Sequence, residues 1–418
     1  MTRLRFHTCA DRWIVMPSSP IAVTGIGIVS SIGVGRAAFW DALCAGASGI
    51  TPIEGLVRHD GAPRIAAPVG DFAARDLIRS PQLRRMDRLS RMAVAASRLA
   101  LSDARLAPDG VLPERAGIVF GTALGDIEDS SGHLERIFTR GPSAASPMVF
   151  PNLVMNAPAG YVAMELGFTG VNFTVAQAEV TGEHAIALGC DVLQSGRADV
   201  VLAGAADALS PIVFHVYHRA RILAGQRGGR EWSSPYDVAR SGIVLGEGAA
   251  MLVLEALAPA RARGATIYAT IEETCRFAVP APPHEWPLRA DSARAALRRL
   301  LDGGVDLICG GANSSRRLDR CELALFADAV GNRPGGTSVT SIKGAIGEFG
   351  AAGALTVAAA CLGLHAQAVP PLCHLHTPES DVPFRFAAAR AAAARIERAL
   401  VCGIARGGAG VALSLQRQ

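Results

Sequence analysis

Lysine is almost absent from this chain of 418 residues: it occurs once, at Lys343, and arginine supplies the other strongly basic side chains. The formal net charge is +4, and no arginine block is interleaved with aromatic residues. This composition argues against a nucleic-acid-binding protein. Because a compact ammonium and a planar guanidinium are not interchangeable, we expect the single lysine to lie where arginine does not fit.

Paired cysteines and long apolar runs are also lacking. The nine cysteines form no C-x-x-C pair, so we expect free thiols in a reducing cytoplasm, with no metal site and no cofactor. No apolar run reaches the roughly 18 residues of a membrane-spanning helix. Residues 1–18 lack the apolar segment and the cleavage site of a signal peptide. We expect them to be an N-terminal extension, with Met16 as an alternative start.

Short apolar segments next to glycine turns recur along the chain and predict an α/β protein. Strands are expected at 21–28, 116–122, 200–203, 249–255, 267–271, 305–309 and 410–415, and helices at 84–104 and 292–301. The segments GEGAAMLVLE (246–255) and GGAGVALSLQ (407–416) both carry a glycine turn followed by a strand of equal length. This repeat indicates two similar halves packed together, over residues 19–258 and 259–418.

Two other patterns have a functional and a structural interpretation. The G-x-G of the first strand is not followed by the third glycine or the acidic residue of a dinucleotide site, so a nucleotide site is disfavoured. The arginines of the helix at 84–104 alternate with apolar residues at helical spacing. They are interpreted as one solvated helix face rather than as a docking surface for an acidic carrier.

The segment SSPYDVARSGIVLGEGAAMLVLE (233–255) closely resembles the S-R-P-F-D-x-x-R-x-G-F-x-x-G-E-G-A segment of β-ketoacyl-acyl-carrier-protein synthases. Other matches to this family are VTGIGIVSSIG (23–33), SGRADVVLAGAADA (195–208), SIKGAIGEFGAAGA (341–354) and GIARGGAG (403–410). They follow the family's order from about residue 20 to the C-terminus. The resemblance implies the thiolase fold, with five layers in the order αβαβα and duplicated halves.

The catalytic cysteine of the family, which forms an acyl thioester at a helix N-terminus, has no counterpart in this sequence. The family motif T-A-C-x-S-G aligns with residues 175–182, and Gly182 as anchor puts Glu179 in place of the cysteine. A slip of one residue would put Ala178 or Val180 there, and none of these three side chains forms a thioester. Cys190 lies three helical turns further on and is expected to pack in the core.

The two catalytic histidines of the family are also replaced. Gly311 stands in place of the first, in an alignment anchored by Asp319 and Glu322, which match the family's D-x-x-E. Glu348 stands in place of the second, five residues after Lys343, which keeps the position of the family's lysine.

Arg406 stands where the family carries a phenylalanine that gates the pocket. Because a buried carboxylate is costly unless it is paired, Glu179, Lys343 and Glu348 are expected to form a Glu–Lys–Glu cluster. We interpret this cluster as a filling of the vacant pocket, with a catalytic pair of carboxylates as the alternative.

The resemblance therefore implies a subunit without condensing activity of its own. Each lost oxyanion donor costs about 10²–10³ in rate, and here both donors and the nucleophile are missing. Similar family members, the chain length factors of type II polyketide synthases, pair with an active ketosynthase and shape its acyl tunnel. We expect the same heterodimer here, in polyketide, polyene or fatty-acid-like chain elongation, with an acyl carrier protein engaged mainly through the partner.

Two loops, 125–138 and 141–161, are expected to cap the tunnel of the partner. Side chains that face either the acyl chain or the subunit interface are Met148, Phe150, Leu153 and Met155. Two alternatives stay open, and a third kind of protein is disfavoured. A priming decarboxylase is disfavoured because such ketosynthases keep both histidines; the others are a hydrolase or decarboxylase that uses Glu179 and Glu348, and a homodimeric scaffold that binds an acyl carrier protein without reacting.

Overall fold

The computed structural model describes residues 19–53, 65–70, 72–78, 81–106, 110–331, 336–380 and 382–418. The predicted extension, residues 1–18, lies outside them. Within the described part of the chain, no helix is long and apolar enough to cross a membrane.

Two groups of strands form the framework. The strands of the first half are β1 (Ile21–Ser30), β5 (Ala116–Gly121), β6 (Asn172–Val175), β7 (Val200–Asp207) and β8 (Gly248–Ala256). Those of the second half are β9 (Ala269–Ala278), β10 (Leu307–Gly310), β11 (Thr337–Thr340), β13 (Phe384–Arg385), β15 (Arg398–Ile404) and β16 (Ala409–Gln416). Short strands are β2 (Gly33–Val34), β3 (Thr51–Pro52), β4 (Ile65–Ala66), β12 (Ala368–Val369) and β14 (Ala392–Ala393).

The strands pair in the same way in both halves, as the predicted duplication requires. In the first half β1 and β7 run antiparallel to β8, and β5 runs parallel to β7 and β6. In the second half β9 and β15 run antiparallel to β16, and β10 runs parallel to β15 and β11. A short antiparallel ladder between Ile21–Val23 of β1 and Ala269–Ile271 of β9 joins the halves into one hydrogen-bonded path.

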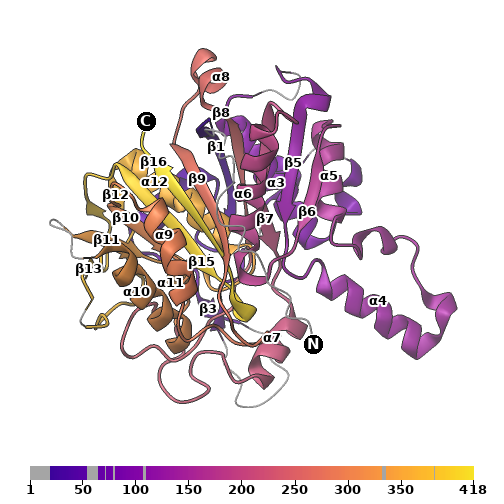
Figure 1. The fold of residues 1–418 in the computed structure, drawn as a ribbon. Coiled ribbons are helices and arrows are strands. Elements are labelled where there is room, and N and C mark those ends of the chain that lie inside the picture. Colours follow the sequence, from indigo (N-terminus) through magenta and orange to yellow (C-terminus); the bar gives the residue numbers. More distant parts are fainter. Residues whose placement is uncertain are drawn as a thin grey trace, which may run out of the picture.

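The helices complete the layers. They are α1 (Arg36–Cys44), α2 (Ala74–Leu77), α3 (Arg88–Asp103), α4 (Ile127–Arg140), α5 (Ala157–Leu166), α6 (Thr181–Gln194), α7 (Pro211–Arg219), α8 (Leu257–Ala262), α9 (Arg294–Leu300), α10 (Arg316–Val330), α11 (Lys343–Ile346) and α12 (Ala352–Ala366). Helices α6 and α12 contact each other and strands of both halves, so they form the middle layer. Helices α3 and α5 pack on the strands of the first half, and α9 packs on β9 and α10 (Figure 1).

The middle layer requires very small side chains. Helix α12 is buried along almost its whole length and consists largely of alanine, with leucine, valine and glycine between. A Cβ added at Gly182 of α6 would collide with the backbone of Ala354 in α12. The expected five layers, αβαβα, are confirmed in this arrangement. The boundary at residues 258/259 stays a prediction.

The predicted loop at 125–138 is mostly wrong, because residues 127–140 form helix α4. The carboxylate of Asp126 accepts a hydrogen bond from the backbone N–H of Asp129 at 3.0 Å and caps this helix. Glu128 and Asp129 in the first turn favour the same helix terminus electrostatically. The predicted loop at 141–161 likewise contains the start of α5.

Candidate functional site

A cavity of about 440 Å³ lies at the N-terminal end of α6, where the sequence predicts the degenerate active site. Its walls are mainly apolar, and Glu179, Asp207, Glu348 and Arg406 contribute ionisable groups to its lining. The apolar lining includes Leu124, Ile127, Leu209, Ile212, Val213, Val216 and Phe349. Among the described residues that line it there is no cysteine and no histidine. The cavity therefore offers neither a thiol nucleophile nor an imidazole donor.

Glu179 lies in a single 3₁₀ turn, Ala178–Val180, directly before α6. Its side chain is 5% exposed. The Nε of Arg406 donates to its Oε1 at 2.6 Å, and the backbone N–H of Arg406 donates to its Oε2 at 3.0 Å. Both carboxylate oxygens therefore have a donor from the same residue, which fixes the carboxylate in place.

Arg406 is held from several sides. It begins the turn between β15 and β16. Its guanidinium lies 4.7 Å from the ring centre of Tyr217 and 5.5 Å from that of Trp286, and it also donates to the Tyr217 hydroxyl. Burial lowers the pKa of Arg406, but the charges of Glu179, Tyr217 and Glu348 together with the hydrogen bond to Glu179 outweigh it, so that the pKa is raised. The guanidinium is thus a permanent, stacked cation above Glu179.

Lys343 and Glu348 form a second, separate ion pair. The Nζ of Lys343 lies 3.0 and 2.9 Å from the two carboxylate oxygens of Glu348, and the amide of Asn313 donates to Oε2 of Glu348 at 2.5 Å. Both charged side chains are at most 4% exposed. Burial raises the pKa of Glu348, and Lys343 works against that shift.

The predicted Glu–Lys–Glu cluster is therefore wrong in one member. Glu179 pairs with Arg406, and Lys343 pairs with Glu348. Arg406 supplies donors to both oxygens of Glu179, so Glu179 needs no bond from the lysine. The two pairs still influence each other, because the charge of Glu179 contributes to the raised pKa of Glu348.

Gly311, at the place of the first family histidine, lies against a buried carboxylate. Its backbone N–H donates to Oε1 of Glu322 at 2.9 Å, and a Cβ on Gly311 would lie 3.1 Å from that oxygen. The other oxygen of Glu322 accepts from the Tyr236 hydroxyl at 3.1 Å. A larger side chain at 311 would have to displace this network.

The sequence interpretation did not identify Glu183, Asn313 and Tyr217 as members of the site. Glu183 is 3% exposed, and its Oε2 has no hydrogen-bond partner among the described residues. Burial raises the pKa of Glu183 to about 7, and the charge of Lys343 partly opposes the shift. The sequence feature that could have identified Glu183 is its spacing from Glu179, because a residue four positions further on in a helix lies one turn along the same face.

A buried carboxyl near Lys343 predicts a stability that falls as the pH rises from about 4.5 to about 8. Burial raises the pKa of Glu322 from 4.5 to about 8, and the charge of Asp319 adds to the shift. The folded chain then holds a proton that the unfolded chain releases above its own pKa. The resulting stabilisation is complete below pH 4.5 and is lost as the pH rises toward about 8, by up to about 1.4 kcal/mol per pH unit for one group.

Urea unfolding at pH 6 and pH 8.5 tests this expectation. Glu322→Gln keeps an acceptor for Gly311 and removes the titration, so its free energy of unfolding should fall less between the two pH values than that of the parent chain. An exposed matched control, Glu397→Gln, should keep the parent's dependence. Equal slopes for parent and Glu322→Gln would contradict the expectation.

None of the four predicted tunnel or interface residues lines the cavity within this chain. Met148 and Phe150 are 63% and 64% exposed, and Leu153 and Met155 are partly buried. Cys190 is buried in α6, and burial raises the pKa of its thiol to about 12, which makes it an inert core residue.

The duplicated five-layer architecture, with the site at the N-terminus of a buried central helix, defines a protein of the thiolase fold. The model of the β-ketoacyl synthase N-terminal domain matches residues 18–260, and that of the C-terminal domain matches residues 280–376. The chain belongs to the β-ketoacyl synthase family, as its motifs predict.

Relatives include both fatty-acid and polyketide proteins. The 3-oxoacyl-[acyl-carrier-protein] synthase 2 of Synechocystis sp. is 29% identical, over 95% of this chain and 98% of the relative. The tetracenomycin polyketide synthase ketoacyl synthase alpha subunit of Streptomyces glaucescens is 32% identical, over 93% and 95%. The solved structure of the ishigamide ketosynthase/chain length factor has a TM-score of 0.88 and 30% identity, with 96% of this chain and 100% of that chain covered.

Proposed function

We propose that this chain is the non-condensing, chain-length-factor-like subunit of a heterodimeric ketosynthase. The observation that carries the proposal is the state of the nucleophile position, where Glu179 is buried and bound through both oxygens by Arg406. A carboxylate held in this way forms no thioester, and no imidazole lines the cavity among the described residues. The partner would supply the Cys-His-His site and most of the contact with the acyl carrier protein.

Catalysis by the two carboxylates is a weaker alternative. A general acid or base needs a free lone pair or proton in reach of a substrate. Glu348 accepts hydrogen bonds from the Nζ of Lys343 and the amide of Asn313, and Glu179 accepts two hydrogen bonds from Arg406 and forms an ion pair with its guanidinium. Both carboxylates therefore use in structural contacts the lone pairs that a catalytic acid or base would need.

A concentration of exposed apolar side chains between residues 124 and 173 supports a partner subunit. Most of the large apolar side chains that are exposed in the described chain lie in this stretch, and they include Leu134, Phe138, Met148, Phe150, Val154, Met164 and Phe173. Phe138 is 84% exposed and projects from α4, which stands out from the body of the molecule (Figure 1). Apolar side chains gathered in this way are typical of an obligate interface.

The strand at one edge of the sheet, β6, begins in the same stretch. Strand β6 pairs only with β5 among the described residues, so its other edge has unpaired backbone groups. An exposed edge strand readily pairs with a strand of another chain. We propose that an active ketosynthase of the same fold covers this edge and the apolar side chains around it.

Co-expression with a cysteine-bearing ketosynthase encoded in the same genomic neighbourhood tests the proposal. We expect a one-to-one complex in size exclusion, and chain elongation on the acyl carrier protein only when both subunits are present. Replacing the partner's nucleophilic cysteine by alanine should abolish elongation, whereas Glu179→Gln in this chain should leave at least half of the rate. A homodimer of this chain that ignores the ketosynthase would contradict the heterodimer and favour a scaffold. Loss of elongation in a folded Glu179→Gln complex would instead indicate a chemical role for Glu179.

A further inference from the structure

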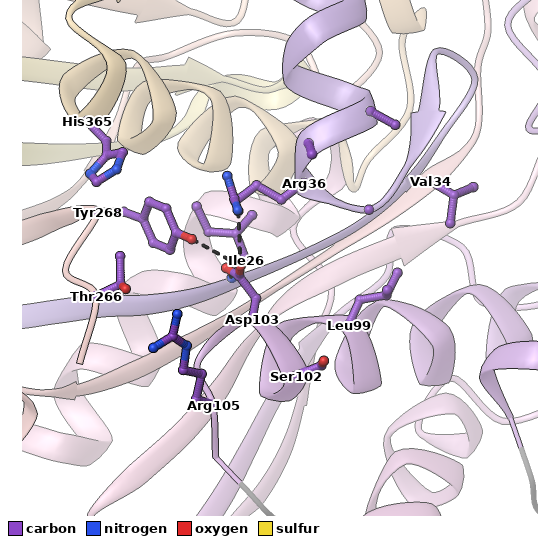
Figure 2. A pocket seen from close by; sticks show the side chains of 13 residues that line it. Ile26, Val34, Arg36, Leu99, Ser102, Asp103, Arg105, Thr266, Tyr268 and His365 are labelled. Carbon is purple, nitrogen blue, oxygen red and sulfur yellow. Dashed lines mark hydrogen bonds and ion pairs between the residues drawn. The ribbon is translucent and has the colours of Figure 1, made fainter. Parts of the chain in front are cut away.

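A second cavity, of about 680 Å³, shares no lining residue with the site described above. It lies where the start of α1, the end of α3, the loop before β9 and the end of α12 meet, so both halves of the chain contribute to it (Figure 2). Its polar lining consists mainly of Arg36, Ser102, Asp103, Arg105, Thr266 and His365. We call it the Arg36–Arg105 groove.

Arg36 is fixed within this groove. Its Nε donates to Oδ1 of Asp103 at 3.0 Å, and its guanidinium carbon lies 5.4 Å from the ring centre of Tyr268. Asp103 is itself oriented by the Tyr268 hydroxyl at 3.0 Å and by the backbone N–H of Ile26 at 2.9 Å. The Nε of Arg36 is used by Asp103, and a further side-chain hydrogen bond joins the guanidinium to Tyr268. Because a guanidinium has five N–H donors, Arg36 held in this way still has N–H groups to offer to a planar or tetrahedral anion.

Arg105, the second residue after the end of α3, adds a second guanidinium. Its backbone has φ 53°, in the left-handed region, and its N–H donates to the carbonyl of Ser102 at 3.1 Å. Figure 2 shows the guanidinium rising toward Thr266 and Asp103. No hydrogen bond or ion pair joins this side chain to another described residue, so its charge is not neutralised locally within the described structure.

The third basic side chain is His365, in the last turn of α12. Its ring meets the Tyr268 ring edge-on, with 5.1 Å between the centres. No hydrogen bond occupies its ring nitrogens within the described part of the chain. The hydroxyls of Thr266 and Ser102 are exposed donors on either side of the groove.

The charges in the groove do not balance. Two guanidiniums face a single carboxylate, Asp103, and that carboxylate already receives three donors. We propose that the Arg36–Arg105 groove binds a small molecule that carries a phosphate or diphosphate group, with both guanidiniums donating to the phosphoryl oxygens. Guanidinium nitrogens match the geometry of phosphoryl oxygens, and the volume lies in the range of small-molecule sites.

Calorimetric titration of the purified chain, or of its complex with the ketosynthase, with pyrophosphate tests this site. We expect saturable binding, weakened about tenfold or more by Arg36→Gln and by Arg105→Gln, because each removes charged hydrogen bonds to the anion. Arg105→Gln is the decisive variant, since it breaks no contact within the described structure, whereas Arg36→Gln also leaves Asp103 without its cation. The matched control is Arg395→Gln, whose side chain is 87% exposed and lies outside the groove.

Three results would overturn the proposal. They are the absence of saturable pyrophosphate binding, an unchanged affinity in Arg105→Gln, and malonate binding as tight as that of pyrophosphate, which would indicate a general anion site. The titration measures binding and not elongation, so its outcome is independent of the role proposed for the subunit.

Discussion

Replacing the single lysine by methionine, Lys343→Met, should lower the free energy of unfolding by about 3–5 kcal/mol, the cost of leaving a buried charge without its partner. Glu348 is 2% exposed and receives the Nζ of Lys343 on both oxygens. Methionine fills a similar volume, so the loss measures mainly the missing charge. Urea unfolding at pH 7, followed by circular dichroism, gives the difference.

A double variant separates the charge from the packing. Lys343→Met combined with Glu348→Gln removes both charges and keeps an amide oxygen that accepts from Asn313. We expect this variant to recover most of the lost stability. As a matched control, Arg289→Met removes a well-exposed member of an ion pair and should change stability by less than about 1 kcal/mol. A Lys343→Met variant within 1 kcal/mol of the parent chain would show that Glu348 finds another partner or takes up a proton.

The expectation that arginine does not fit at 343 can be judged from the same contacts. The Nζ of Lys343 lies almost equally far from the two oxygens of Glu348, and the side chain is 4% exposed. A guanidinium is larger and needs more acceptors than this pocket provides. Lys343→Arg should therefore destabilise the chain, even though it keeps the charge.

Local sequence patterns were sufficient for the framework of this fold. Apolar segments next to glycine turns located β1, β5 and β8, because a buried strand must be apolar on both faces. The repeated segment at 246–255 and 407–416 indicated the duplication, and these segments contain β8 and β16, which occupy matching places in the two halves. Strand ends were less predictable: β7 extends to Asp207, beyond the apolar run that predicted it.

The pairing of charges in the site was not predictable in the same way. Glu179 and Arg406 are far apart in sequence, and their contact depends on the path of the turn between β15 and β16. No local sequence pattern predicts whether Glu179 pairs with Arg406 or with Lys343. The segment at 125–138 failed for another reason, because the loop was inferred from the family resemblance and not from the residues themselves, which form helix α4.

That same exposed helix leads to the prediction with the largest effect on assembly. The double variant Leu134→Asp/Phe138→Asp should reduce the heterodimer below detection in size exclusion at micromolar concentrations and lower elongation about 100-fold or more. Leu134 and Phe138 are four residues apart on α4, so they share one face, and both are at least half exposed in the single chain. Two carboxylates on this face would have to be buried without partners if the ketosynthase covers it.

The free subunit should tolerate these changes, because neither side chain belongs to the core of the described chain. Its circular dichroism spectrum and its urea midpoint should stay within error of the parent, which separates lost assembly from lost folding. Leu288→Asp is the matched control, since Leu288 is 69% exposed and belongs to the second half of the chain and to neither α4 nor β6. It should assemble and elongate like the parent. If the α4 variant still forms a one-to-one complex with full activity, α4 lies outside the interface, and the subunit contact must be sought elsewhere on the molecule.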